Sequence, residues 1–273
     1  MSIIKEVKDG VEIVGQVLGK AGDDSNAKAA AGELGKSALT ITKTINNALL
    51  PLAALNYGIE KARKYFNEKF AIDLSEKTSA IPPENIVEPK SSIAGPALQG
   101  LAFSYEEPNL KEMYLNLLAS AMDGRIAENV HPAFVQVIQQ LTSEEAQLLL
   151  NYLCDGMGTP IAEIRLKDTR NGAWNTMHRH LLDVRDKSTN MAIANPRIPA
   201  MVDNWIRLGL VTVEYGKFLT ATEIYDWVKQ RPEYLNITID NSNLSSMQLT
   251  YEKGVMGRSS FGVQFARAVG VLK

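Results

Sequence analysis

The sequence predicts a mainly α-helical protein, with an N-terminal helical bundle followed by a small α+β domain of the winged-helix type. Apolar residues recur every three or four positions over most of the first 141 residues, which is the period of an amphipathic helix. After that point, shorter helical patterns alternate with stretches of period-two hydrophobicity. We therefore expect three parts: an N-terminal helix and flexible joint (1–33), a helical bundle (34–141) and the winged-helix-like domain (142–273).

The first part is a short helix and a joint. Residues 3–19 have helical apolar spacing that Gly10 and Gly15 weaken, because each glycine costs about 1 kcal/mol relative to alanine in a helix. The next stretch, GKAGDDSNAKAAAGELGK, has few bulky side chains. We expect it to be flexible before an alanine-rich helix begins.

A long amphipathic helix is predicted over residues 34–59, with a kink or break at Pro51. It carries few charges, so it could pack in the bundle core, contact a membrane or pair with a second copy. Packing in the core is the simplest interpretation. The residues that would make a membrane or oligomer contact are Ile41, Ile45, Leu49, Leu52 and Leu55.

Residues 82–97 predict an ordered, proline-rich strap between two helical stretches. Pro82 and Pro83 end the preceding helix, and an extended course continues to Pro89. Serines 91 and 92 are expected to cap the next helix, with Pro96 in its first turns and Gly95 allowing close backbone approach. Residues Ile86 and Val87 should point inward.

Two further helices complete the predicted bundle. NLKEMYLNLLASAMDGR places its apolar residues on one stripe and stops near Gly124. HPAFVQVIQQL begins with His131, which is interpreted as structural, and with Pro132 near the helix start.

The second half mixes helices and strands. TSEEAQLLLNYLC has the acidic first turn and the Thr142 or Ser143 cap of a helix. The remaining expectations are a short strand at 161–167, helices at 171–184 and 198–211, a hairpin at 211–220, a helix at 222–235, a strand at 235–241 with a partner at 249–256, and a final serine-capped helix at 259–272.

Composition limits the class of protein. The net charge is −2 and the pI is near 6.0, so a nucleic-acid site would have to be a local patch. The single cysteine, Cys154, cannot form an intramolecular disulfide and is expected to be a buried thiol. No uncharged apolar stretch reaches the ~20 residues of a membrane span, and no secretory signal is evident, which favours a cytoplasmic location.

No catalytic, cofactor-binding or metal-binding motif is present. The sequence has no CxxC, HExxH, GxxxxGK[ST] or GxSxG pattern. His178 and His180 are two positions apart and would face different sides of a helix. We expect no enzyme activity, no cofactor and no small-molecule substrate.

One cluster could bind a nucleic acid or a protein partner. If the second domain is a winged helix, residues 172–185 would be its groove-reading helix. Asp168, Asp183 and Asp186 dilute the positive charge, and winged folds also bind proteins. The candidate contact residues are Arg165, Lys167, Arg170, Trp174, His178, Arg179 and Arg185.

The order of several motifs resembles the bacterial Abi-alpha (abortive infection alpha) family. They are NALLPLAALNYGIEK, PPENIVEPKSSIAGPALQGL, EPNLKEMYLNLLASAMD, HPAFVQVIQQLTSEEAQLL and NWIRLGLVTV, and the resemblance spans most of residues 34–265. It implies a role in phage defence through growth arrest or death of infected cells, and it carries over no catalytic residue. The family-typical positions are architectural: Pro82, Pro83, Pro89, Gly95, Pro96, His131 and Pro132.

The sequence thus favours a non-enzymatic phage-defence factor that acts through protein contacts, including contacts with a second copy. A nucleic-acid-binding regulator that uses residues 165–187 is one alternative. A membrane-perturbing effector that uses residues 34–59, placed peripherally at the inner membrane, is the other.

Overall fold

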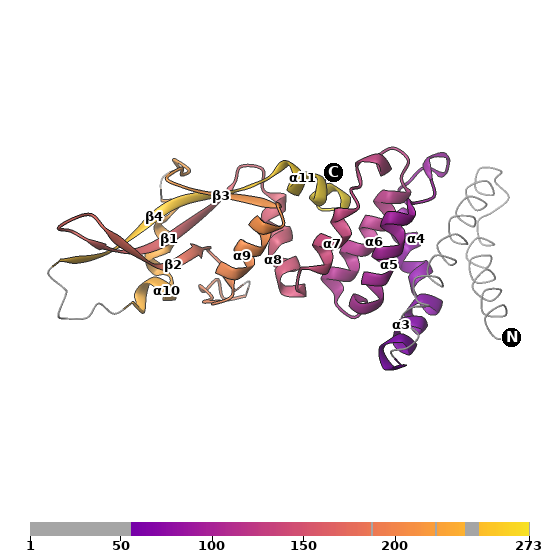
Figure 1. Cartoon of the computed structure of the whole chain (residues 1–273), viewed down its shortest axis with the longest axis horizontal. Coiled ribbons are helices and arrows are strands. Elements are labelled where there is room, and N and C mark those ends of the chain that lie inside the picture. Colours follow the sequence, from indigo (N-terminus) through magenta and orange to yellow (C-terminus); the bar gives the residue numbers. More distant parts are fainter. Residues whose placement is uncertain (1–55, 187, 222, 238–245, 273) are drawn as a thin grey trace. The chain divides into compact units, whose positions relative to one another are not determined.

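The computed structural model describes residues 56–186, 188–221, 223–237 and 246–272, which form two compact units (Figure 1). The first unit comprises the chain up to Leu150 and the segment from Gln264 onward, and the second comprises Asn151–Val263. The predicted N-terminal helix and joint, and the proposed contact residues Ile41, Ile45, Leu49, Leu52 and Leu55, lie outside the described residues.

The described part of the first unit is helical. Its elements are α3 (Asn56–Glu68), α4 (Phe70–Thr78), the short 3-10 turn η2 (Pro83–Asn85), α5 (Ser91–Ser104), α6 (Pro108–Met122), the 3-10 turn η3 (Ala127–Asn129), α7 (Ala133–Gln139) and most of α8 (Ser143–Cys154). Helix α11 (Ser260–Ala268) returns to this unit over its C-terminal half.

Helix α6 is the centre of this unit. Its apolar residues are buried around most of the helix circumference, and it packs against α4, α5 and α7. The Phe265 ring of α11 meets the Phe134 ring of α7 edge-on, with centroids 5.7 Å apart. Ser120 of α6 donates to the Ala268 carbonyl at 2.9 Å, and so satisfies an acceptor at the C-terminal end of α11.

The 82–97 strap is ordered and bonded to the end of α6. Val87 donates its N–H to the Met122 carbonyl at 2.9 Å, and Gly124 donates to the Asn85 carbonyl at 2.7 Å. Ile86 and Pro89 are buried, but Val87 is exposed, so only part of the expected inward face exists. These backbone bonds hold the strap against the C-terminal end of α6.

The start of α5 differs from the expectation. Ser91 and Ser92 lie inside the helix, and Lys90, which has no side-chain cap, precedes it. Pro96 is inside α5 on its exposed side, where the Ser92 carbonyl that loses its helical donor can meet water. Gly95 faces open space, and the close approach occurs instead at Gly100, against the Tyr114 ring.

Two predicted helix caps are confirmed. Thr142 and Glu145 form a reciprocal capping box at the start of α8, in which each backbone N–H donates to the side chain of the other residue, at 2.9 and 3.2 Å. Ser259 accepts the Gly262 N–H at 2.8 Å at the start of α11. Cys154 is exposed, so the expectation of a buried thiol is wrong.

The second unit contains a four-stranded antiparallel sheet in the order β2-β1-β4-β3. Its elements are β1 (Thr159–Asp168), β2 (Trp174–Leu181), α9 (Ile198–Arg207), β3 (Val211–Tyr215), the 3-10 turn η4 (Asp226–Gln230), α10 (Pro232–Leu235) and β4 (Met247–Arg258). One face of the sheet packs through Ala162 and Ile164 on Tyr225, which precedes η4, and on Val228, which lies within it. Helix α9 packs on β2 and β3.

The expected fold class is wrong: the chain is an α+β protein, not a mainly α protein with a winged-helix domain. The helix expected at 171–184 is strand β2, because pairing with β1 overrides the helix-like spacing of Trp174, Met177 and Leu181. The hairpin expected at 211–220 does not form, because β3 pairs with the distant β4. The helix expected at 222–235 is reduced to η4 and α10.

Gly100 provides a test of packing in the first unit. A Cβ at this position would lie 2.5 Å from Tyr114 Cζ, a distance at which the buried ring must move. We expect Gly100→Ala to lower the free energy of unfolding by about 1–3 kcal/mol. Gly95→Ala, on the same helix with nothing within 4 Å, should raise it by about 0.5–1 kcal/mol.

Urea unfolding followed by far-UV circular dichroism measures both changes. The three tryptophans all lie in the second unit, so their fluorescence separates an effect on that unit from one on the bundle. Equal effects of the two substitutions would contradict the assigned packing.

Candidate functional site

The structure places five of the seven predicted contact residues on strands, and none of the seven on a helix. Arg165 and Lys167 are on β1, Arg170 is in the β1–β2 turn, and Trp174, His178 and Arg179 are on β2. Arg185 follows β2, four residues after the strand ends. The groove-reading helix on which the nucleic-acid alternative depended is therefore absent from this segment.

Strand β2 is an edge strand whose pairing with β1 is irregular. The register shifts twice, because Arg165 pairs with Thr176, Ile164 with His178 and Ala162 with Leu181. Each shift gives β2 more residues than β1 over the same length, which is the property of a β-bulge. His180 lies within the second irregularity and has φ of 53°, a left-handed conformation that non-glycine residues rarely adopt.

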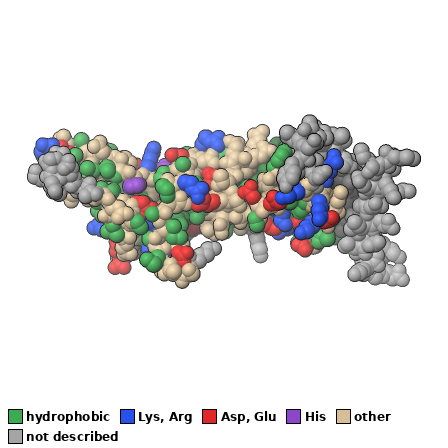
Figure 2. Space-filling model, turned by 90° about the horizontal axis from the view of Figure 1, so that it is seen from below, with side chains coloured by type: hydrophobic (Ala, Val, Ile, Leu, Met, Phe, Trp, Pro, Cys, Tyr) green, Lys and Arg blue, Asp and Glu red, His purple; other side chains and the backbone are tan. Residues whose placement is uncertain are grey.

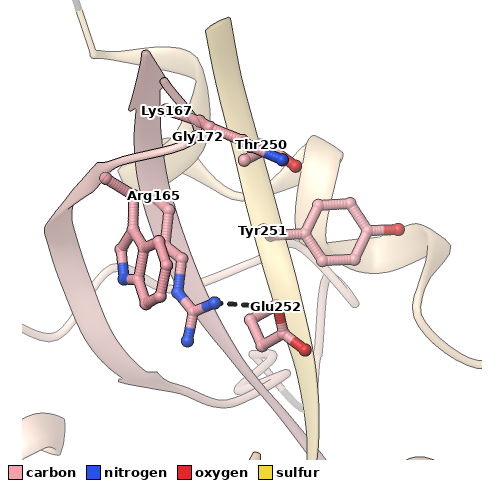
Figure 3. Close-up of a pocket in the computed structure, with 7 residues that line it drawn as sticks. Arg165, Lys167, Gly172, Thr250, Tyr251 and Glu252 are labelled. Atoms are coloured by element: carbon pink, nitrogen blue, oxygen red, sulfur yellow. Dashed lines mark hydrogen bonds and ion pairs between the residues drawn. The ribbon is translucent and has the colours of Figure 1, made fainter. Parts of the chain in front are cut away.

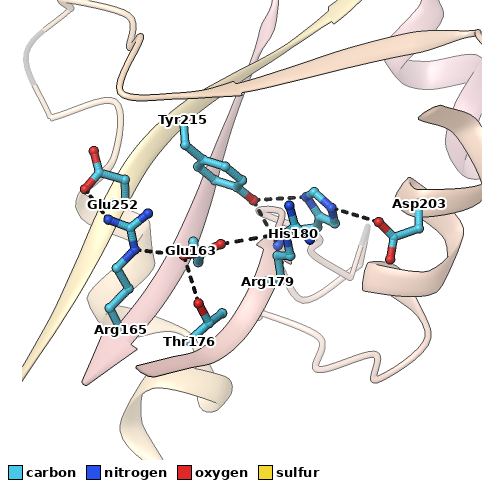
Figure 4. A network of polar contacts seen from close by, with 8 residues as sticks. All are labelled: Glu163, Arg165, Thr176, Arg179, His180, Asp203, Tyr215 and Glu252. Carbon is cyan, nitrogen blue, oxygen red and sulfur yellow. Dashed lines mark hydrogen bonds and ion pairs between the residues drawn. The ribbon is translucent and has the colours of Figure 1, made fainter. Parts of the chain in front are cut away.

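A buried carboxylate organises the sheet face opposite the η4 core (Figure 4). Glu163 is buried, accepts from Arg165 Nε at 2.7 Å and from Thr176 Oγ1 at 3.1 Å, and lies 3.7 Å from Arg179 Nε. Arg165 also donates to Glu252 on β4 at 2.8 Å. The buried charge is thus paired and hydrogen-bonded, as a charge inside a protein must be.

His180 links three elements through both ring nitrogens. Tyr215 Oη of β3 lies 3.0 Å from His180 Nδ1, and Asp203 Oδ1 of α9 lies 3.1 Å from His180 Nε2 (Figure 4). The backbone N–H of His180 also donates to Tyr215 Oη at 3.1 Å. These partners assign a neutral imidazole that donates from Nε2 to Asp203 and accepts at Nδ1 from the tyrosine hydroxyl.

Tyr215, His180 and Asp203 are connected in the order of a nucleophile, a base and an orienting acid. The pKa shifts of Tyr215 and His180, however, favour a structural role. Burial raises the pKa of Tyr215 to about 12. Burial also lowers the pKa of His180, and this effect outweighs the opposing one of Asp203. The tyrosine hydroxyl already donates one bond and accepts another, so its role here is to hold His180 in its left-handed conformation.

A pocket of about 250 Å³ lies beside the Glu163 cluster. Arg165 and Trp174 line it, and the guanidinium carbon is 4.7 Å from the indole centroid, within cation–π range. Glu252, Thr250 and Lys167 complete most of the wall. Figure 3 shows the Arg165 guanidinium bonded to Glu252 at this pocket.

Acidic partners within the second unit neutralise most cations of the predicted cluster. Asp168 binds Arg170 in a two-pronged ion pair, and this arginine lowers the pKa of the carboxyl to about 2. Asp183 binds Arg185 at 2.9 Å. Trp174 nevertheless remains 54% exposed and Met177 42% exposed on the edge strand.

His131 and Pro132 lie away from this cluster, in the first unit. His131 Nδ1 accepts the Ala133 N–H at 3.1 Å at the start of α7, and its ring packs near Phe134. This contact gives the side chain a local capping role.

Sequence reasoning missed His180, Asp203, Tyr215 and the two carboxylates Glu163 and Glu252. His180 is not among the seven candidate contact residues that the sequence predicts. One usable signal existed at Glu163, which interrupts the apolar strand IAEIRL, because a charge between buried strand positions requires a partner. The partners themselves are distant in the sequence.

Fold and site together define an α+β protein whose central polar cluster is internally satisfied. Within the described residues, no three His, Cys, Asp or Glu side chains gather in a way that could hold a metal ion. Among the described helices, none combines the length and the apolar character that a membrane span requires.

The chain belongs to the Abortive infection alpha family, whose model matches residues 62–269. The resemblance inferred from the sequence is thereby confirmed. Comparisons with curated proteins and with solved structures found no match.

The neutral His180 predicts a defined pH dependence of stability. Because its folded-state pKa is lowered, the unfolded chain takes up a proton first as the pH falls through about 6.5. Stability of the second unit should therefore be complete above that pH and decline below it, by at most about 1.4 kcal/mol per pH unit for one proton. Asp203, Tyr215, Arg179 and Glu163 are the charged or titratable groups that act on the ring.

Tryptophan fluorescence during urea unfolding between pH 7.5 and 5 measures this slope. His180→Asn should flatten it, since asparagine tolerates the left-handed conformation and does not titrate. Asp168 and Asp186, whose pKa values are about 2, affect stability only near pH 4 and below. An unchanged slope in the variant would refute the assignment of a neutral His180.

Proposed function

We propose that this protein is an abortive-infection factor that acts through protein contacts made by the second unit, without catalysis of its own. Membership of the abortive infection alpha family suggests a role in phage defence. The contact mechanism rests on one observation: most cations of the predicted cluster are paired with carboxylates, whereas Trp174 and Met177 on β2 are exposed. Tryptophan, methionine and arginine are enriched in protein interfaces.

The same observation weighs against the nucleic-acid alternative. A phosphate that approached Arg165 or Arg170 would have to displace a carboxylate that is already bound in two-pronged or shared geometry. Figure 2 presents one face of the protein, on which basic and acidic side chains are interspersed with hydrophobic ones. A surface that tracks a phosphate backbone would instead be continuously basic.

Absence of catalysis is supported by the state of the strongest candidate group. Tyr215 has a raised pKa and a hydroxyl whose hydrogen bonds are both made within the protein. The membrane alternative depends on residues 34–59, most of which lie outside the described residues, and it is tested separately below.

The contact proposal predicts the effect of truncating the exposed edge-strand side chains. Expression of the whole chain should reduce phage plating, and the double variant Trp174→Ala, Met177→Ala should lose about tenfold or more of that reduction, the size of one interface hot spot. Leu235→Ala, an exposed apolar residue on α10, is the matched control. Full protection by the double variant at equal protein level would reject the proposed surface, and no protection by the unaltered chain would reject the defence role.

Two binding measurements address the alternatives. Duplex DNA at low salt should show no binding in fluorescence anisotropy, and salt-dependent binding that Lys167→Ala and Arg179→Ala weaken would favour a nucleic-acid regulator. Flotation of the whole chain with anionic vesicles, accompanied by dye leakage, would favour the membrane effector.

A further inference from the structure

Soon after β2, residues 184–186 and 188–193 form the described part of a small hairpin, called the 184–193 hairpin. Ile193 donates its N–H to the Val184 carbonyl and Asp186 donates to the Met191 carbonyl, both at 2.9 Å, and Arg185 and Ala192 form a bridge between them. The Asp186 carboxylate closes the turn by accepting the N–H groups of Ser188 and Thr189, at 2.9 and 2.8 Å. The Ser188 hydroxyl also donates to this carboxylate, and this bond, together with the backbone N–H bonds, lowers the Asp186 pKa to about 2.

A buried arginine clamps the base of this hairpin. Arg231, only 1% exposed, donates from Nη1 to the Val184 carbonyl at 2.7 Å and from Nη2 to the Ile193 carbonyl at 2.6 Å. Its Nε and Nη2 also donate to the Glu233 carboxylate, at 3.1 and 2.8 Å. One planar guanidinium therefore joins both arms of the hairpin to the start of α10.

The clamped segment displays apolar side chains to solvent. Met191 is 69% exposed and Ile193 is 40% exposed. Both belong to the hairpin arm whose backbone is held by the Ile193–Val184 and Asp186–Met191 hydrogen bonds and by the bridge between Arg185 and Ala192. Burying a charge is unfavourable unless the charge is fully paired. The buried Arg231 is therefore an unusual means of ordering the 184–193 hairpin, a surface turn that contributes little to the core. Ordering such a segment in advance reduces the entropy that a later binding event would lose.

We infer that the 184–193 hairpin is a preformed docking element whose Met191 and Ile193 side chains enter an apolar pocket on a protein partner. Methionine is suited to this because its unbranched, polarisable side chain adapts to irregular apolar surfaces. The charges favour a protein over a nucleic acid or an anionic membrane. In the described part of the hairpin and its clamp, Asp183 pairs with Arg185, Glu233 pairs with the buried Arg231, and the Asp186 carboxylate stays ionised at the turn, so these residues present no unpaired cation to a phosphate backbone or an anionic headgroup.

This inference rests on the proposed function only in taking the partner to be a protein. The docking test uses the whole chain with a photoreactive benzophenone amino acid in place of Met191, expressed in phage-infected cells. The control carries the same group in place of Met157, an 86% exposed methionine in a different loop of the second unit. A discrete protein adduct is expected from position 191 and none from position 157.

A second substitution makes the adduct specific. Ile193→Asp in the photoreactive chain should reduce adduct yield about tenfold, since a charge in an apolar pocket opposes docking. Arg231→Lys keeps the charge but loses the fork, so the amides of Ile193 and Asn190 should exchange faster with solvent and adduct yield should fall. Should Arg231→Lys fail to fold, the surface variants still decide the question.

Each outcome supports or overturns the inference. The inference would be overturned by equal adducts from positions 191 and 157, by no adduct at 191, or by an adduct that is insensitive to Ile193→Asp. An adduct of two copies of this chain, or vesicle flotation that Met191→Asp abolishes, would also overturn it. An Ile193-dependent adduct in a chain that gives no phage protection would leave docking intact and reject the defence role. Docking alone would be rejected if the double variant Met191→Asp, Ile193→Asp protected as well as Met157→Asp and the photoreactive chain gave no adduct from position 191.

Discussion

Antiparallel pairing of β1 with β4 is the contact on which the second unit depends. It runs without a register shift from Thr159 opposite Met256 to Asp168 opposite Met247, and it joins segments separated by about eighty residues of chain. Because side chains alternate across a strand, this register determines which face each residue occupies. It places Ile164 beside Tyr251 toward the η4 core, and it places Glu163 beside Glu252 on the opposite face. Arg165 lies between these two carboxylates because the register brings them together.

Buried polar groups in this unit are satisfied by residues from distant elements. Glu163 is paired by arginines of β1 and β2, His180 by β3 and α9, and Arg231 by Glu233 and by the 184–193 hairpin. A buried charge or imidazole without its partners would cost several kcal/mol, so these contacts favour one conformation of the surface segments attached to them. The left-handed His180 and the clamped hairpin are both consequences of this requirement. Rigid display of Trp174, Met177, Met191 and Ile193 follows from it, and this is the physical basis of the proposed contact mechanism.

The first unit follows a simpler rule, in which apolar burial around α6 decides the packing and local signals decide the helix ends. The capping box at Thr142 and Glu145 and the proline-rich strap were predictable because each depends on neighbours within a few residues, and the same holds for the Ser259 cap in the second unit. The position of close helix approach was not predictable in the same way. Gly95 and Gly100 look alike in the sequence, and only the location of the Tyr114 ring distinguishes them.

The sequence by itself determined the helical periodicity of the first unit, the order of the strap, the caps at Thr142 and Ser259 and the family, since all of these depend on local pattern or on motif order. Tertiary structure decided the fold class, because β2 has a spacing that a helix could also use and its state depends on pairing with β1. It also decided the pairing of β3 with β4 and the polar cluster. Five of the seven predicted contact residues are arginine or lysine, which in the sequence indicates a basic surface. In the structure, Glu163, Glu252, Asp168 and Asp183 form ion pairs with four of these five cations. Charge in a sequence is a count, whereas the charge that a partner meets depends on which opposite charges the fold has brought within hydrogen-bonding distance.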